Sequence, residues 1–424
     1  MIAQATLKQT EIGMIPVDWG IRELKEVAKV NESYVGKNFK FPEIEYIDID
    51  SVENGNISKS QFLLLKDAPS RARRIVKKDD IIISTVRPNL RHFAFVKDPK
   101  PNTVVSTGFA VISCKRVNPR FLYYYLTTNR YTQHLTAIAD SHTSTYPSFN
   151  VDVLENSPIP YPDGAEQRAI ARVLTVLDGK IELNQRMNKT LEEIGRAIFK
   201  RWFIDFEFPN EDNKPYKSSG GEIVYNEESE KEIPKGWEVS DVDKEFNFVM
   251  GQSPPGTSYN ETGEGIVFFQ GRTDFGHRFP SIRVFCTEPA RFAKKGDTLI
   301  SVRAPVGDTN LALQDCCIGR GLAAIRHKSD SSSYTYYLMM TLNPTFGSFE
   351  AEGTVFGSLS KADFQKIKIV APRKEVIQRF EDTVGLIDKK IEDNTFQTFS
   401  LSGIRESLLP KLMSGKIRIP IEVR

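Results

Sequence analysis

Residues 166–203 have the sequence EQRAIARVLTVLDGKIELNQRMNKTLEEIGRAIFKRWF. The residues predicted to line the contact with a partner helix, called the seam residues, recur at steps that alternate between four and three, as in the a and d positions of a heptad repeat. No proline interrupts the stretch, and its other positions are mostly helix-favouring Glu, Lys, Arg, Gln and Ala. The spacing predicts one helix of about 55 Å, which is too long to pack on one small domain and needs a long partner. The predicted seam residues are Ile170, Leu174, Leu177, Ile181, Asn184, Leu191 and Ile198.

A second stretch repeats this pattern 210 positions later, where Phe380 matches Ile170 and Asn394 matches Asn184. Polar residues at seam positions cost stability but fix the register of two helices. Packing on a domain core would explain either amphipathic helix alone, whereas two matching helices in one chain favour an intramolecular coiled coil. The seam residues predicted for the second helix are Phe380, Ile387, Ile391, Asn394, Leu401, Leu408 and Leu412.

The first helix ends in an aromatic cluster that contains Phe199, Trp202 and Phe203, with Arg201 among them. Such residues could face a partner protein. Large aromatic side chains at a helix end are more often buried in a core, and we expect burial here.

The bulk composition is that of an ordinary soluble protein, and 424 residues are enough for two or three domains. The net charge is only +2, so any nucleic-acid binding must come from local basic patches. The four cysteines form no CxxC pair, which argues against a disulfide framework or a zinc motif and favours a reducing cytoplasm. We expect no signal peptide, no membrane segment and no metal site.

The whole chain has the pattern of a duplication. IPVDW at 15–19 returns as IPKGW at 233–237, and DIIISTVRP at 80–88 returns as DTLISVRAP at 297–305. The predicted fold is α+β, with two similar mixed α/β domains, two long helices and a pseudo-twofold internal repeat. The predicted segments are the first domain (1–163), the first long helix (164–206), an exposed linker (207–231), the second domain (232–372), the second long helix (373–414) and a C-terminal tail (415–424).

With these segments in view, the chain resembles the specificity (S) subunit of type I restriction-modification systems over nearly its full length. The segments that carry the resemblance are IPVDWGIRELKEVAKV (15–30), IPKGWEVSDVDKEF (233–246), the long helix with its continuation (166–209), MGQSPPGTSYNETGEGIVFFQGRTDFG (250–276) and IRESLLPKLMSGKIRI (404–419). The resemblance implies two target recognition domains that each bind one half of a split sequence in double-stranded DNA. It also implies that the two helices form an antiparallel coiled coil that sets the distance between the half-sites.

The same resemblance implies a non-catalytic subunit of a site-specific restriction endonuclease and adenine-DNA methyltransferase complex in the cytoplasm. Two modification subunits and two restriction subunits are the expected partners. S-adenosylmethionine, ATP and Mg are expected in those partners and no cofactor in this chain.

Candidate DNA-binding residues fall into three groups. A basic run contains Arg71, Arg73, Arg74 and Lys77, for which phosphate contact competes with a simple solvated surface. Arg87 and Arg303 recur in the two copies, which favours a shared structural or phosphate role, and Arg91 lies close to Arg87. Residues that read bases should differ between the copies, and polar side chains in unmatched loops are therefore better candidates. These are His142, Ser144, Thr145, Gln252, Tyr259, Asn260, Gln270, Arg272 and Arg278.

Two other functions remain open. A DNA adenine methyltransferase acting alone would need a catalytic tetrapeptide, and Asn343-Pro344-Thr345-Phe346 resembles one with the wrong third residue. No glycine-rich cofactor-binding turn accompanies it, so we expect no catalytic residue. A coiled-coil scaffold that binds only proteins is the second alternative, and failure to bind DNA together with a modification subunit would favour it.

Overall fold

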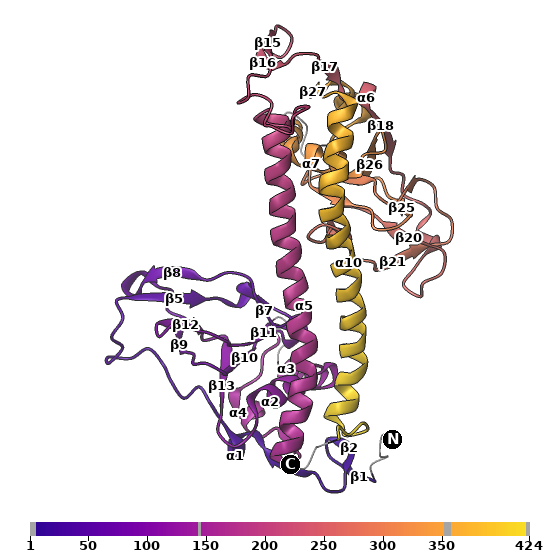
Figure 1. The fold of residues 1–424 in the computed structure, drawn as a ribbon. Coiled ribbons are helices and arrows are strands. Elements are labelled where there is room, and N and C mark those ends of the chain that lie inside the picture. Colours follow the sequence, from indigo (N-terminus) through magenta and orange to yellow (C-terminus); the bar gives the residue numbers. More distant parts are fainter. Residues whose placement is uncertain (1–5, 143–145, 352–357, 421–424) are drawn as a thin grey trace. The chain divides into compact units, whose positions relative to one another are not determined.

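The computed structural model describes residues 6–142, 146–351 and 358–420. The chain divides into two compact units, one containing residues 1–182 and 398–424 and the other residues 183–397. Each unit combines one globular domain with part of two long helices, which Figure 1 shows as α5 (Gly164–Phe199) in magenta and α10 (Lys374–Met413) in yellow. Both boundaries between the units therefore fall within a helix, one in α5 and the other in α10.

A four-stranded antiparallel sheet with the order β11-β10-β13-β4 forms the centre of the first domain. All of β10 is buried because apolar residues cover both faces of the sheet. Ile81 and Ile83 pack against the domain's helices, and Ile82 packs toward the second sheet. The elements are β4 (Ala28–Val30), β10 (Ile81–Ser84), β11 (Phe93–Phe95), β13 (Phe109–Cys114), α1 (Leu24–Val27), α2 (Pro119–Leu126), α3 (Asn129–His142) and α4 (Val151–Glu155).

The second sheet of this domain has the order β8-β5-β12-β9 and contains one parallel pair, β5 with β12. Strand β9 lies at an edge of this sheet and carries a register shift opposite Val105 and Ser106. The strands are β5 (Glu43–Ile47), β8 (Gln61–Leu64), β9 (Ala72–Ile75) and β12 (Thr103–Ser106), with the short pairs β1 (Leu7–Thr10) and β2 (Gly13–Pro16), β3 (Gly20–Glu23) and β14 (Pro158–Tyr161), and β6 (Val52–Glu53) and β7 (Asn56–Ile57). Single 3-10 turns are η1 (Ile49–Ser51), η2 (Leu65–Asp67) and η3 (Pro88–Leu90).

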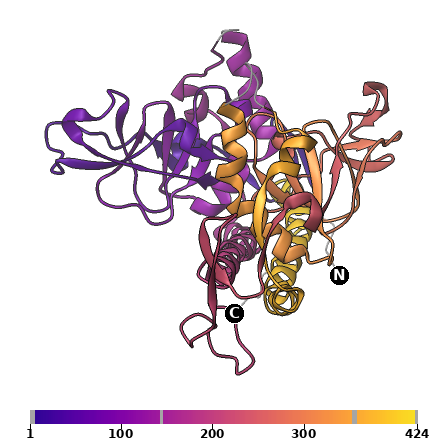
Figure 2. The same ribbon diagram turned by 90° about the horizontal axis from the view of Figure 1, so that it is seen from above.

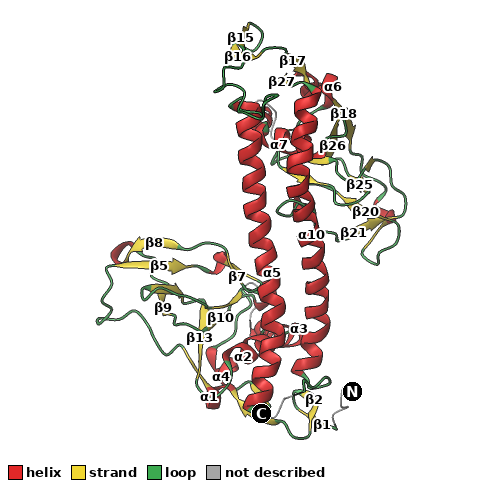
Figure 3. Cartoon of the chain, in the orientation of Figure 1, coloured by secondary structure: helices red, strands yellow, loops and turns green. Residues whose placement is uncertain are grey.

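The second domain repeats this plan, which confirms the predicted mixed fold and the internal repeat. Its sheets have the orders β18-β26-β23-β24 and β19-β21-β20-β25-β22, again with one parallel pair, β20 with β25 (Figure 3). The elements are β17 (Glu238–Asp241), α6 (Val242–Glu245), β18 (Phe246–Met250), η5 (Gly256–Ser258), β19 (Tyr259–Asn260), β20 (Ile266–Phe269), η6 (Arg272–Asp274), β21 (Val284–Cys286), β22 (Phe292–Ala293), β23 (Thr298–Ser301), β24 (Thr309–Leu311), β25 (Cys316–Ile318), β26 (Leu322–His327), α7 (Ser332–Thr341), α8 (Asn343–Ala351), α9 (Lys361–Lys366) and β27 (Lys368–Ala371).

Helices α5 and α10 lie side by side and antiparallel, as predicted (Figures 1 and 2). In the second unit Asn184 of α5 contacts Gln397, and Phe199, further along α5, contacts Phe380, nearer the start of α10. All of the predicted seam residues are buried or half-buried. Eight of them are buried, namely Ile170, Leu174, Ile181, Asn184, Phe380, Ile391, Asn394 and Leu412.

The polar seam residues bond across the helix pair in the second unit. The Asn184 amide donates to Oε1 of Gln397 at 2.9 Å, and the Asn394 amide donates to Oδ1 of Asn188 at 2.9 Å. Asn188 also donates to Oγ1 of Thr395 at 3.2 Å. A shift of one helix by a turn would leave these buried amides without partners, so they specify the alignment of the helices.

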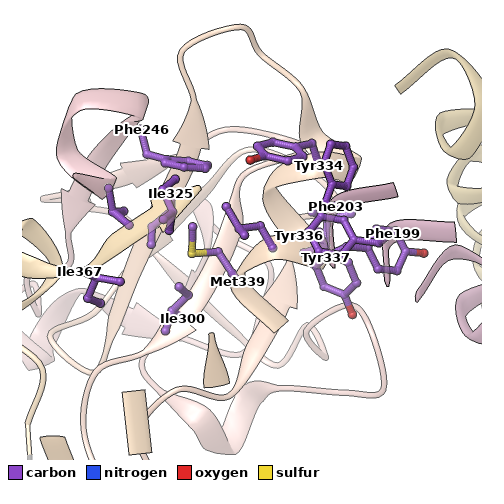
Figure 4. Close-up of a cluster of buried hydrophobic side chains, with 14 of the residues drawn as sticks. Phe199, Phe203, Phe246, Ile300, Ile325, Tyr334, Tyr336, Tyr337, Met339 and Ile367 are labelled. Carbon is purple, nitrogen blue, oxygen red and sulfur yellow. The ribbon is translucent and has the colours of Figure 1, made fainter. Parts of the chain in front are cut away.

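The aromatic residues at the end of α5 are buried, which confirms the expectation of a core role. Phe199 is 1% exposed, and a π-helical turn at Lys200–Ile204 brings both Trp202 and Phe203 into the same cluster. Their rings lie 5.1–5.8 Å from the ring of Phe380 of α10. Figure 4 shows Phe199 and Phe203 beside the tyrosines of α7, so this cluster joins the second domain to both helices.

The segment 207–231, expected to be an exposed linker, is held in part against the second domain. Phe208 is buried, and its ring lies between Tyr216 at 4.5 Å and Trp237 at 5.1 Å. Arg379 of α10 donates to the backbone oxygen of Pro209. Strands β15 (Ile223–Asn226) and β16 (Lys231–Pro234) form a hairpin here, and the pair β1 and β2 precedes the first domain in the same way.

His327 predicts a pH dependence of stability. Its side chain is buried against Phe246 and Tyr334, and burial lowers the pKa of the imidazole below its ordinary value despite Glu245 nearby. In the unfolded chain the His327 imidazole therefore takes up a proton near pH 6.5, whereas in the folded chain it stays neutral to lower pH. The free energy of unfolding consequently falls as the pH drops below about 6.5. We expect the melting temperature to fall more between pH 7.5 and 5.5 for the wild type than for His327→Gln. Equal decreases would contradict this assignment.

Candidate nucleic-acid interface

The predicted basic run lies on strand β9 and next to it. The structure divides this run into residues that pair with carboxylates and residues that do not. Arg71 pairs with Asp48 at 2.5 Å, and Lys77 pairs with Glu32 at 3.6 Å. Arg73 is exposed, and among the described residues its side chain donates only to the backbone oxygen of Ser70. Arg74 is half-buried, burial lowers its pKa, and its Nε has no hydrogen-bond partner among the described residues. Arg73 and Arg74 are therefore the better candidates for an external anion.

Arg87 and Arg303 are both exposed at the ends of equivalent strands, but they are not equivalent residues. Val86 bridges to Ser148 in the first domain, whereas Arg303 itself bridges to Ser358 in the second. Arg303 thus corresponds to Val86, and Arg87 lies one residue later. Because side chains alternate along extended backbone, this offset removes the argument that the two arginines share one role.

Arg87 and Arg91 differ in how their side chains are held. Arg87 has a left-handed backbone conformation, and its guanidinium lies 5.0 Å from the ring centre of exposed Tyr146. Arg91 donates to the side chains of Asn54 and Asn129 and to the backbone oxygen of Thr127. Arg91 therefore holds the domain's own loops together.

The unmatched loops of the second domain contain both structural and available polar side chains. Asn260 uses both ends of its amide within its own turn, accepting from the backbone of Gly263 and Glu264 and donating to the oxygen of Glu264. Tyr259 donates to Pro254 and stacks on Phe268 at 4.7 Å. Arg272 pairs with Asp308 at 2.6 Å. The side chains that remain available are Gln252 and Gln270, which are exposed.

The structure buries Arg278, so the prediction that it contacts DNA is wrong. Its side chain is 2% exposed, pairs with Asp388 of α10 at 2.7 Å and donates to Tyr337 at 3.2 Å. The guanidinium also lies 4.2 Å from the ring centre of Tyr336. The position of Arg278 in a polar loop predicts a surface group, but the guanidinium neutralises a buried carboxylate.

The first unit has the same tyrosine–aspartate pair with a different arginine. Tyr124 donates to Asp178 at 2.7 Å, and Arg405 of α10 pairs with the same carboxylate at 3.1 Å. This pair borders a cleft of about 1120 Å³ within the first unit, whose lining also includes Arg91 and His134. Asp178 is thus paired with an arginine of α10, whereas Asp388 is paired with an arginine of the second domain, so the two domains contact the helices differently.

Three of the predicted residues cannot be placed as side chains. Ser144 and Thr145 lie outside the described residues, and His142 is the last residue of α3.

The tetrapeptide at 343–346 begins helix α8, where Asn343 donates to the backbone oxygen of Gly307 and Phe346 is fully buried. Within the described ranges, no cluster of three His, Cys, Asp or Glu side chains could hold a metal ion, and no helix is long and apolar enough to cross a membrane.

The structure also places together polar and aromatic residues outside the predicted set. The loop between β4 and β5 borders a hollow of about 420 Å³, whose lining includes Tyr34, Lys37, Asn38, Lys40 and Phe41. Tyr34 is 72% exposed, and the three polar side chains are also exposed. In the sequence, the mixture of aromatic and basic residues in YVGKNFKF (34–41) is the pattern that could indicate nucleic-acid binding here.

Comparison with known proteins gives a consistent result. The family model described as type I restriction modification DNA specificity domain matches residues 16–193 and 234–394. A protein assigned as the specificity subunit of the type I restriction enzyme MjaX of Methanocaldococcus jannaschii is 29% identical over 435 residues, which cover 98% of this chain and 97% of that protein. The HindI specificity subunit of Haemophilus influenzae is 25% identical, with 94% and 100% covered.

Among solved structures, the type I restriction-modification S subunit from M. genitalium superposes with a TM-score of 0.58. Its sequence is 17% identical, and the match covers 97% of this chain and 99% of that one. This likeness shows that the two chains share a fold.

Proposed function

Because the chain belongs to the family of type I restriction-modification DNA specificity subunits, we propose that it binds a DNA target in two separate parts. The observation that carries this proposal is the internal repeat. The two domains share the order of their first, four-stranded sheet and one parallel pair in the second sheet, which has one more strand in the second domain, and the loops around these sheets differ. A shared scaffold with different loops suits two readers of different half-sites.

The loops between the two sheets illustrate the difference. In the first domain, residues 31–42 connect β4 to β5 without a strand of their own. In the second domain, the corresponding segment contains η5 and β19. Different loop lengths and side chains on one scaffold would bring different donors and acceptors to the DNA bases.

We further propose that α5 and α10 set the distance between the half-sites and provide docking surface for the partner subunits. Leu183 and Ile194 of α5 are 42% and 43% exposed, and Leu386 of α10 is 74% exposed. Exposed apolar side chains on paired helices suit contact with another protein. The partners would be two modification and two restriction subunits, which would bring S-adenosylmethionine, ATP and Mg, while this chain alone would catalyse no reaction.

Selection from a random DNA library tests the proposal. The chain would be purified with its modification subunits, and bound duplexes would be sequenced at a stated salt concentration. We expect two short fixed motifs separated by a constant, unspecified gap. One continuous motif would contradict reading by two domains, and failure to bind any DNA would favour a protein scaffold.

A control with the chain alone addresses the methyltransferase alternative. The purified chain would be incubated with DNA and labelled S-adenosylmethionine. We expect no transfer of the label without the modification subunit, and transfer by the chain alone would replace the proposal with that alternative.

A further inference from the structure

The loop 34–41 of the first domain is held in place at its N-terminal end and at Phe39. The backbone N–H of Val35 donates to the oxygen of Arg73 at 2.7 Å, and that of Ile75 donates to Ser33 at 3.1 Å. Val35 is buried, and Phe39 packs on the same apolar cluster. The loop is thus attached to edge strand β9, and the backbone that carries its exposed side chains is preorganised.

The side chains that this loop exposes are of the kinds that bind nucleic acid. Between the two anchors, Lys37 and Asn38 are exposed, and Lys40 is exposed directly after Phe39. Tyr34 presents an aromatic ring at 72% exposure. Lysines bind phosphates, and an amide can bond two edge atoms of one base.

The neighbouring strand β9 adds two arginines that do not pair with a carboxylate among the described residues. The backbone of Tyr34 is bridged to that of Arg74, whose Nε is buried and has no hydrogen-bond partner in the described part of the chain, and the preceding residue, Arg73, is exposed. Within the described residues, Lys37, Lys40, Arg73 and Arg74 form no ion pair with a carboxylate, whereas Arg71 and Lys77 nearby do. Lys37 and Lys40 line the hollow, and Arg73 is exposed on the neighbouring strand. These unpaired cations produce a local field that attracts a polyanion, although the chain as a whole is nearly neutral.

The second domain has related features at the corresponding place. Arg291 precedes β22, the counterpart of β9, and its backbone oxygen accepts from Ile318 of the neighbouring strand. Gln252 begins the equivalent loop, is exposed, and donates its backbone N–H to Ile318. An arginine beside a loop with an exposed amide therefore recurs, whereas the loop sequences differ.

From these observations we infer that the loop 34–41, together with Arg73 and Arg74, is the DNA-contacting edge of the first recognition domain. Lys37, Lys40 and Arg73 bind backbone phosphates of the first half-site. Asn38 bonds a base edge, with adenine as the expected partner of its amide. This assignment rests on the proposed function and adds which residues perform it.

The test compares variants of the full chain in complex with its modification subunits, using the split target that the wild type selects. Lys37→Gln combined with Lys40→Gln should weaken binding to all sequences and lower the slope of log affinity against log salt by about 2. Lys361→Gln combined with Lys366→Gln, on exposed positions of α9, makes the same charge change and should leave the slope unchanged. All four lysines are exposed, so the fold should tolerate their replacement.

Base reading is tested by repeating the library selection. Asn38→Ala should lose about 5- to 150-fold of discrimination at one position of one motif and leave the other motif unchanged. Gln252→Ala, at the equivalent loop of the second domain, should affect only the other motif. If the wild type selects no split motif, the proposed function fails. If it does, but the Asn38 variant selects the same motifs and the lysine variant keeps the wild-type salt slope, this inference is overturned while the proposed function stands.

Discussion

Inserting seven residues into each long helix should lengthen the unspecified gap in the DNA target by between about one and three base pairs. Seven helical residues add about 10 Å, and one base pair occupies about 3.4 Å, which gives the upper limit. The insertions belong after Glu182 in α5 and after Gln397 in α10, where the two compact units meet along the chain. Asn184 contacts Gln397 across the helix pair, so both insertions lie at one level.

The same variant should bind the original target about 10²–10⁴-fold more weakly, because only one domain can engage at a time. Library selection gives the new gap, and titration of the original target gives the loss. A matched control inserts seven residues at Gly220, in an exposed turn of the segment before the second domain, and should keep the original gap. An unchanged gap in the helix variant would show that the helices do not set the spacing.

Arg278→Ala should destabilise the second unit by about 3–5 kcal/mol, since it leaves the Asp388 carboxylate buried without its counter-charge. The Asp388 side chain is 13% exposed and would keep only neutral donors among the described residues, namely the Tyr337 hydroxyl at 3.0 Å and the Ser333 hydroxyl. Burial already raises the pKa of Asp388. Hydrogen exchange of α7, which carries Tyr337, measures the loss locally in the full chain.

The first unit offers a matched control for this substitution. Arg405 makes the same contact with Asp178, but its side chain is 35% exposed, so water can replace it. Arg405→Ala should therefore cost about 1 kcal/mol or less. Adding Asp388→Asn to Arg278→Ala should recover part of the lost stability because it removes the buried charge. Equal losses for the two arginines would contradict the role of burial.

Gly195 explains why the two units use different arginines. It occupies the position in α5 that Arg405 occupies in α10, 210 residues later. A side chain at Gly195 would collide with the Tyr337 hydroxyl, so the tyrosine approaches the helix backbone directly. The charge on Asp388 must then be balanced from another element, and the second domain supplies Arg278.

Local sequence patterns were sufficient for the helices, the duplication and the family. The heptad spacing from Ile170 to Ile198 and its copy from Phe380 to Leu412 depend only on the 3.6-residue period of a helix, which is a short-range property. Burial of Phe199, Trp202 and Phe203 also followed from residue type and position. Repeated segments preserve such patterns even where loops between them change length.

The binding residues required the tertiary structure, because exposure and charge balance depend on residues far apart in the sequence. Arg278 and Lys37 are both basic residues in loops, yet Arg278 meets a carboxylate 110 positions away at Asp388, whereas Lys37 has none among the described residues. Strand pairing also shows that Arg303 corresponds to Val86 and not to Arg87. By itself the sequence determined a duplicated chain with two long paired helices, since periodicity is local. Folding decided which cations remain without a carboxylate partner, since neutralisation is a contact between distant residues.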